Sequence, residues 1–168
     1  MNIIQKNWSW PNALTARQST KYCVWHHSAC SNQMQDTDEI WQEHINIGDN
    51  GIAYTRILKG NGDTVQGRPD WAVSAAAHGA NFCSIDIVVE GDFEASESSE
   101  KPTDAQIQAV KNNMVDINQK YPGIIHCGHY QVQYISGDPG DATACPGSTF
   151  IAMLPDLIKE TKGLFYQR

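Results

Sequence analysis

Histidine and cysteine side chains gather in three short segments of this 168-residue chain. The segments are VWHHSAC at 24–30, CGHYQ at 127–131 and DATACPG at 141–147. Two imidazoles and one thiolate are an established ligand set for catalytic zinc, which keeps a fourth coordination position open for water. His26, His129 and Cys145 could supply this set, so the residue types indicate a catalytic metal site.

Each of these side chains also has a purely structural interpretation. A lone histidine is more often a hydrogen-bonded packing residue than a metal ligand, so the case for zinc rests on the combination. The sixteen residues from His129 to Cys145 include the loop-forming sequence GDPGDAT, which is long enough to return the thiolate to the imidazole. Two alternatives stay open at this point: His126 as a ligand, and Cys145 as a nucleophile with His129 as its base. Pro146 and Gly147 directly after the cysteine favour a ligand in a loop.

Several short strands must position these residues. Five segments are predicted as strands: residues 22–26, 54–58, the region of Val65, 85–89 and 124–126. The first ends at the histidine pair, and 85–89 is a nearly continuous apolar run, as in a central strand covered on both faces. Asn61 and Gly62 predict a hairpin that joins two of the strands as an antiparallel pair.

Three helices are predicted between and after these strands. The first begins at Asp36 and Glu39, which have capping-box spacing, and Gly48 and Gly51 close it. The second begins with the Thr103 and Gln106 capping box, presents one apolar face and ends at residues 121–123. The last extends over residues 148–162, with a restart at Pro155 considered, and Gly163 is its expected C-cap. The acidic segment 94–101, EASESSEK, is expected to be an exposed loop.

Length, composition and charge limit the number of domains, the fold class and the kinds of partner that this protein can have. With 40% hydrophobic and 18% charged residues, the 168 residues suit one domain, 1–168. Interleaved strands and helices with one antiparallel hairpin predict an α/β fold, a central mixed sheet flanked by helices. The net charge of −7 argues against nucleic acid and anionic membranes as partners. We expect no membrane insertion and no signal peptide, hence synthesis in the cytoplasm, and no disulfide scaffold from five cysteines.

Beyond the metal-capable residues, a series of landmarks occurs in a characteristic order between about residues 20 and 158. They are HHSA at 26–29, IAYTRIL at 52–58, GRP at 67–69, AAHGAN at 76–81, SIDIVVEGDF at 84–93, PTDAQ at 102–106, GH at 128–129 and CPG at 145–147. In this order the chain resembles the zinc-dependent type 2 N-acetylmuramoyl-L-alanine amidases. That family is related to the peptidoglycan recognition proteins and includes many bacteriophage endolysins.

The resemblance assigns roles to individual residues. It implies Zn²⁺ as the cofactor, held by His26, His129 and Cys145. His27 then faces the other side of its strand. Tyr54 matches a tyrosine kept near the metal, and Thr143 stands where many members have lysine, so electrostatic stabilisation of an oxyanion would be weaker here.

Other matched positions concern the substrate and the central strand. His78 and Asn81 fall in a substrate-cleft segment, and Arg68 belongs to the GRP landmark, with an ion pair to an acidic residue as its structural alternative. Val88 stands where some relatives carry glutamate, which excludes a glutamate-based mechanism. Asp86 stands where glycine is common, and the sequence gives no account of it.

The activity implied is hydrolysis of the bond between N-acetylmuramic acid and L-alanine in bacterial peptidoglycan. Zinc would lower the pKa of its bound water and polarise the carbonyl, with Tyr54 and Thr143 assisting by hydrogen bonds. A monomeric phage or prophage endolysin, acting on the cell wall after release, is the expected setting. The alternatives are a non-catalytic module that binds peptidoglycan, which Cys145 and Tyr54 argue against, and an interaction protein that regulates a host enzyme.

Overall fold

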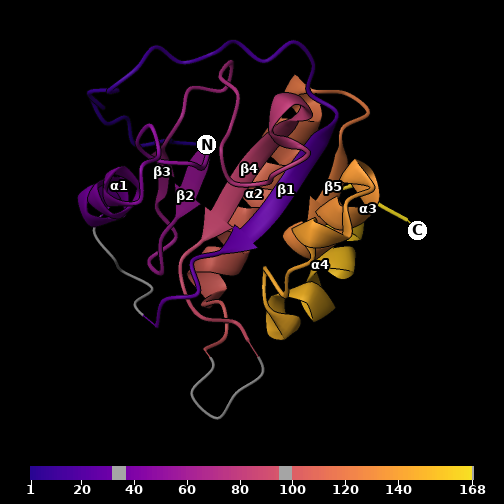
Figure 1. Ribbon diagram of the computed structural model, residues 1–168. Coiled ribbons are helices and arrows are strands. Elements are labelled where there is room, and N and C mark those ends of the chain that lie inside the picture. The colour runs from indigo at the N-terminus through magenta and orange to yellow at the C-terminus, as the bar shows by residue number, and fades with distance from the viewer. Residues whose placement is uncertain (32–36, 95–99, 168) are drawn as a thin grey trace.

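The computed structural model describes residues 1–31, 37–94 and 100–167, and in these a single six-stranded sheet forms the centre of the molecule. Its strands are β1 (Tyr22–His27), β2 (Arg56–Leu58), β3 (Thr64–Gln66), β4 (Ser84–Val89), β5 (Ile125–Gly128) and β6 (Leu164–Phe165). They lie in the order β3-β2-β4-β1-β5-β6, with β2 and β3 antiparallel and the other neighbours parallel (Figure 1). The predicted α/β fold with a central mixed sheet is confirmed.

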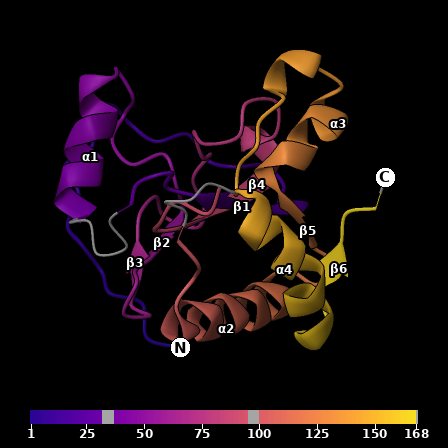
Figure 2. The same cartoon turned by 90° about the horizontal axis from the view of Figure 1, so that it is seen from below.

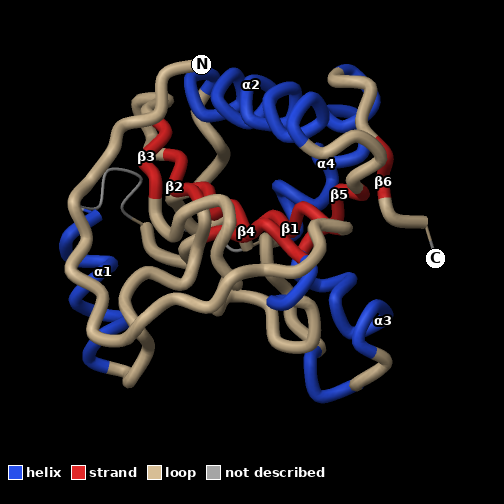
Figure 3. The backbone as a smooth tube through the Cα atoms, turned by 90° about the horizontal axis from the view of Figure 1, so that it is seen from above, coloured by secondary structure: helices blue, strands red, loops and turns tan. Residues whose placement is uncertain are grey.

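Helices cover both faces of this sheet. They are α1 (Thr37–Asn46), α2 (Asp104–Lys120), α3 (Val132–Ser136) and α4 (Ser148–Glu160). Helices α2 and α4 lie on one face, whereas α1 and α3 flank the opposite face at its two sides (Figures 2 and 3). Three short turns also occur: η1 (Asn81–Cys83) before β4, η2 (His129–Gln131) after β5, and η3 (Pro139–Asp141) between α3 and α4. In the part of the chain that the structure describes, no helix is long and apolar enough to cross a membrane.

Alternation along β1 decides what each face of the sheet receives. Cys23 and Trp25 enter the large core beneath α2 and α4, together with Met114 and Phe150. Val24 and His26 point to the other face, since successive side chains of a strand alternate. Two smaller apolar clusters lie on that face. One surrounds Val24, Cys127 and Val132 near α3, and the other surrounds Ile40, Ile57 and Val88 near α1. The alternation thus places His26 in a strip between two apolar clusters.

The predicted elements agree closely with those observed. The hairpin turns at the Asn-Gly pair, where the Gly62 amide donates to Lys59 and the Lys59 amide donates to Asp63. Helix α2 begins with the predicted capping box: Thr103 Oγ1 accepts from the Gln106 amide at 3.0 Å, and Gln106 Oε1 accepts from the Thr103 amide at 3.0 Å. Asp36, the predicted cap of α1, lies outside the described residues, as do residues 95–99 of the predicted acidic loop.

The predicted strand 54–58 is two residues shorter in the structure and begins at Arg56. The successive amides of Gly67 and Arg68 donate to the carbonyls of Thr55 and Tyr54. A regular antiparallel ladder alternates bonded and non-bonded pairs, so two successive bonds interrupt it. Tyr54 therefore lies at an irregular strand end.

The last helix also corrects the sequence prediction. Helix α4 continues through Pro155 without a restart. Pro155 is exposed, so water can satisfy the carbonyl that loses its amide partner. At its end the left-handed residue is Lys162, with φ 58°, whereas Gly163 donates its amide to Ile158. Strand β6 and helix α3 were not predicted; with two and five residues, they are too short to show a periodic pattern.

Candidate metal centre

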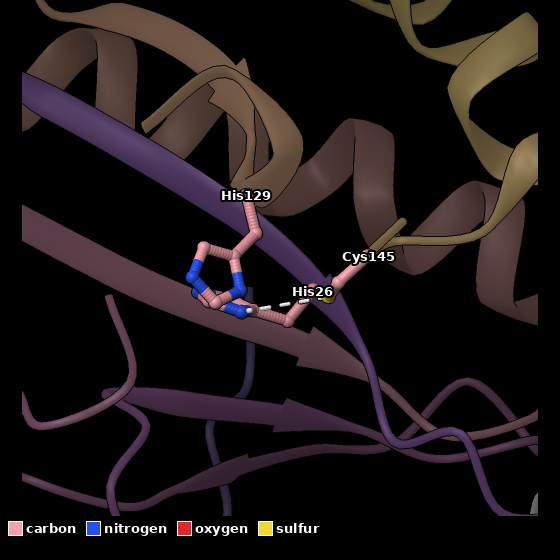
Figure 4. A group of neighbouring side chains, drawn as sticks. All are labelled: His26, His129 and Cys145. Atoms are coloured by element: carbon pink, nitrogen blue, oxygen red, sulfur yellow. Dashed lines mark hydrogen bonds between the residues drawn. The ribbon is translucent and has the colours of Figure 1, made fainter. Parts of the chain in front are cut away.

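Three segments that are distant in the sequence bring His26, His129 and Cys145 together. His26 lies near the end of β1, His129 directly follows the neighbouring parallel strand β5, and Cys145 lies in the loop before α4. One ligand atom from each of the three residues lies within 4.8 Å of the others (Figure 4). His26 Nδ1 is 3.7 Å from Cys145 Sγ, and the two imidazole centroids are 4.6 Å apart. The structure thus assembles the three side chains that the sequence singled out.

These separations can be compared with those that zinc requires. Tetrahedral zinc with nitrogen ligands at about 2.0 Å and sulfur at about 2.3 Å separates its ligand atoms by about 3.5 Å. The observed 3.7 Å between nitrogen and sulfur is close to that value. Two imidazoles and a thiolate also match a known donor set for catalytic zinc, so the residues present fit the metal.

Backbone contacts hold the Cys145 loop against the end of β5. The Tyr130 amide donates to the Cys145 carbonyl at 2.7 Å. A Cβ at Gly128 would lie 3.0 Å from Pro146, and one at Gly147 would lie 2.5 Å from the Phe93 backbone. The glycines in the GH and CPG landmarks therefore permit the close packing that returns the thiolate to His129.

The two clustered histidines differ in their electrostatic environment. Burial disfavours the charged form of His26, but hydrogen bonds with Asp86 and Cys145 outweigh it and raise its pKa to about 9. For His129, burial and the neighbouring His26 lower the pKa to about 4. His26 is thus held between the Asp86 carboxylate on one side and Cys145 Sγ on the other, while His129 stays neutral near pH 7.

Tyr54 and Thr143 each contact one member of the cluster. The Tyr54 and His26 rings pack in a T-shaped pair, with centroids 5.3 Å apart. Burial and then the negative charges of Cys145 and Asp86 raise the Tyr54 pKa, so its phenol remains a hydrogen-bond donor. Thr143 Oγ1 accepts from the Cys145 amide at 3.1 Å. A hydroxyl that accepts one hydrogen bond can still donate its own hydrogen.

The three predicted substrate residues have different environments. His78 is 85% exposed, and its Nδ1 lies 2.8 Å from Asp141 Oδ1, which raises its pKa. Asn81 instead turns into its own loop, where Oδ1 accepts from the Ala77 amide at 2.9 Å. Arg68 is buried and donates to backbone carbonyls, including that of Ile52 at 2.7 Å. These carbonyl contacts replace the ion pair considered for Arg68; contact of any of the three with substrate stays a prediction.

The structure adds three residues that sequence reasoning had left without a role at this site. Asp86 lies 2.9 Å from His26. Asp141, two residues before Thr143, contacts His78 Nδ1. His44 accepts a hydrogen bond from the Ala53 amide at 3.0 Å, and its ring lies beside Tyr54. Asp86 had a visible signal, an acidic residue inside an apolar strand. The partners of the other two depend on tertiary contacts between distant segments.

His126 and His27 lie on the opposite face of the sheet from the cluster. His27 Nδ1 accepts from the Phe93 amide at 3.2 Å, which confirms that its side chain points away from His26. His126 is fully buried; its Nδ1 accepts from Trp25 Nε1 at 3.1 Å and its Nε2 lies 2.9 Å from Asn118 Oδ1. Both ring nitrogens are therefore engaged, and the alternative ligand set with His126 is wrong.

The burial of His126 leads to a prediction for stability in acid. Burial lowers its pKa to about 4, whereas the unfolded chain has an ordinary value of 6.5. The unfolded state therefore binds the proton first, and the His126 contribution, complete above about pH 6.5, is lost as the pH falls toward 4. Between pH 7 and pH 5 we expect a loss of about 2 kcal/mol from this residue.

Urea unfolding of the metal-free protein at both pH values measures this loss. His126→Phe, which cannot titrate, is the matched control and is expected to lose about 2 kcal/mol less stability over the same interval. Equal losses in the two proteins would contradict the prediction.

Together the fold and the cluster define an α/β protein with a candidate catalytic metal centre beside its sheet. Residues 16–148 match the N-acetylmuramoyl-L-alanine amidase family, and the chain belongs to this family. The amidase activity on peptidoglycan that the sequence landmarks predicted is confirmed at the level of the family.

Individual relatives agree with this assignment. The chain is 30% identical to the endolysin of Klebsiella phage KP32 over 120 residues, which cover 70% of this chain and 80% of that protein. It is 30% identical to the endolysin of Escherichia phage T7 over 118 residues, 69% of this chain and 78% of that protein. Among solved structures, N-acetylmuramoyl-L-alanine amidase LysC from Clostridium intestinale URNW has the same fold. The TM-score is 0.83 at 24% identity, covering 97% of this chain and 99% of that one.

Proposed function

We propose that this protein is a zinc-dependent amidase that cleaves the bond between the lactyl group of N-acetylmuramic acid and L-alanine in peptidoglycan. His26, His129 and Cys145 are the proposed zinc ligands. The observation that carries this proposal is the convergence of their ligand atoms within 4.8 Å. Family membership supplies the substrate class, and the donor set supports the metal.

Each residue around the cluster has a definite part in the proposed reaction. Zinc, when bound, supplies Lewis-acid activation of water and of the scissile carbonyl. Tyr54, a neutral donor beside His26, hydrogen-bonds the oxygen on which negative charge develops. Thr143 fixes the Cys145 backbone and offers a second, uncharged donor. Because water is the nucleophile, Cys145 serves as a ligand and forms no covalent intermediate.

Substrate recognition is divided between one direct contact and two supporting residues. His78 is exposed and held by Asp141, so we assign it the contact with the glycopeptide. Asn81 and Arg68 act indirectly, by fixing the loops around Ala77 and Ile52. Their hydrogen bonds to the backbone support this division.

We further propose that the protein is a phage or prophage endolysin that acts on the cell wall after release from the host cytoplasm. Its relatives in Klebsiella and Escherichia phages carry that name. One chain provides all three ligands, so the proposal requires only a monomer. The net charge of −7 offers no attraction to nucleic acid, membrane or anionic wall polymers, so we expect targeting to depend on the residues around the proposed metal site.

Digestion of purified peptidoglycan tests the proposed function. We expect new amino groups and no new reducing sugar ends, because an amide bond is cut and the glycan is left intact. A zinc chelator should abolish amine release, and added zinc should restore it. Peptidoglycan binding without amine release would instead indicate a recognition module, and new reducing ends would contradict the amidase assignment.

A further inference from the structure

We propose that Asp86 is a positioning residue that fixes the ring orientation and tautomer of the metal ligand His26. The inference rests on the proposed zinc site. Asp86 lies in the middle of β4 and is fully buried. Its Oδ1 lies 2.9 Å from His26 Nε2, and its Oδ2 accepts from Ser84 Oγ at 2.7 Å. A carboxylate at the centre of a sheet is thus aimed directly at one nitrogen of a ligand imidazole.

The two nitrogens of His26 face different partners. Nε2 faces Asp86, whereas Nδ1 faces Cys145 Sγ at 3.7 Å. An ionised carboxylate only accepts hydrogen bonds, so it selects the tautomer in which Nε2 carries the hydrogen. In the neutral ring that a metal ligand requires, the Nδ1 lone pair is then directed toward Cys145, the side on which a metal would bind. Carboxylates commonly orient metal-binding histidines in this way.

The same geometry separates this role from that of a general base. Asp86 contacts the nitrogen of His26 that faces away from Cys145, and its second oxygen is engaged by Ser84. Val88, the residue of β4 in register with His26, is apolar and buried in the cluster near α1. Strand β4 therefore carries its carboxylate two residues earlier, behind the ring, where it has no access to the reacting water.

Because Asp86 is buried, its charge must be compensated by neighbouring groups. An ionised carboxylate removed from water is costly unless hydrogen bonds and an opposite partial charge compensate it. The Asp86 carboxylate receives them from His26 and from Ser84 Oγ. The hydrogen-bonded pair spans β4 and β1, so the sheet itself sets the position of the His26 ring.

Zinc affinity, measured by competition with a chromophoric chelator, tests this inference without relying on catalysis. We expect Asp86→Ala to weaken zinc binding by about 10- to 100-fold, the range found when a carboxylate behind a ligand is removed. Asp86→Asn keeps an acceptor oxygen for Nε2, so it should rescue part of the loss. The matched control is Asp70→Asn, a carboxylate paired with Arg56 and Lys120 away from the cluster, which should leave zinc affinity unchanged.

A second measurement needs no variant at Asp86. Long-range ¹H–¹⁵N spectra of the zinc-loaded wild-type protein should show a protonated Nε2 and a metal-bound Nδ1 in His26. Coordination through Nε2 would overturn the proposal even if the Asp86 variants failed to fold, and so would unchanged zinc affinity in folded Asp86→Ala. If the wild-type protein bound no zinc, the proposed metal site itself would be wrong. Failure of the metal site is therefore distinguishable from failure of the role proposed for Asp86.

Discussion

Cys145→Ala is expected to lose zinc binding and amide hydrolysis together, with kcat/KM falling by on the order of 10³-fold or more. Loss of a residue that hydrogen-bonds to a metal ligand already lowers metal affinity or activity by about 10- to 100-fold. Loss of the ligand itself should lower them more. Cys145 is also the one cysteine of the cluster, and as a zinc ligand it would contribute a thiolate charge. Without it two imidazoles would hold the metal from one side, so both affinity and geometry would suffer.

Zinc content after dialysis and amine release from peptidoglycan measure the two effects separately. Cys30→Ala is the matched control, since Cys30 is a free thiol that is not a member of the cluster. We expect full zinc content and full activity in that variant. Zinc retained at wild-type stoichiometry in Cys145→Ala would contradict the ligand assignment.

Chelation and alkylation of the wild-type protein distinguish a ligand from a nucleophile at position 145. A cysteine hydrolase would remain active in chelator and would be inhibited when the metal-free protein is alkylated. The zinc mechanism predicts that the metal-free protein is already inactive. Cys145→Ser adds a further contrast, because a serine hydroxyl is a poorer zinc ligand than a thiolate.

The regular parts of the fold follow from local sequence patterns. The capping box at Thr103 and the Asn-Gly turn each act within a few residues, so β2, β3 and α2 were predictable. Strand β6 and helix α3 depend instead on docking against β5 and on loop closure, which no local pattern records. Pro155 shows the same limit: its exposure, and not its identity, decides whether the helix continues.

The candidate site divides in a similar way. His26, His129 and Cys145 could be named because residue types and ordered landmarks mark them, and the structure brings them together. Their supporting contacts could not be derived, since Asp86 reaches His26 across sixty positions of sequence. Arg68 shows that the partner can be wrong even where the residue is singled out. Its charge suggests an ion pair, but in the structure it donates to backbone carbonyls.

Tyr54→Phe is expected to lower kcat by about 10²- to 10³-fold, the cost of removing one donor that stabilises an oxyanion. The raised pKa of Tyr54 keeps the phenol protonated throughout the neutral range, so wild-type activity should show no titration of this group near pH 7. Zinc affinity should not change, because Tyr54 packs its ring against His26 and is not one of the proposed ligands. Turnover and zinc affinity therefore separate this role from that of Cys145.

Two further variants show whether the effect belongs to the site. Tyr121→Phe, at the end of α2, removes a phenol far from the cluster and should leave kcat unchanged. Thr143→Ala should reduce kcat less than Tyr54→Phe, since part of the threonine's role is to hold the Cys145 amide. Equal kcat values for Tyr54→Phe and wild type would show that the phenol has no part in the reaction. The charge that develops would then have to be stabilised by the metal and Thr143 alone.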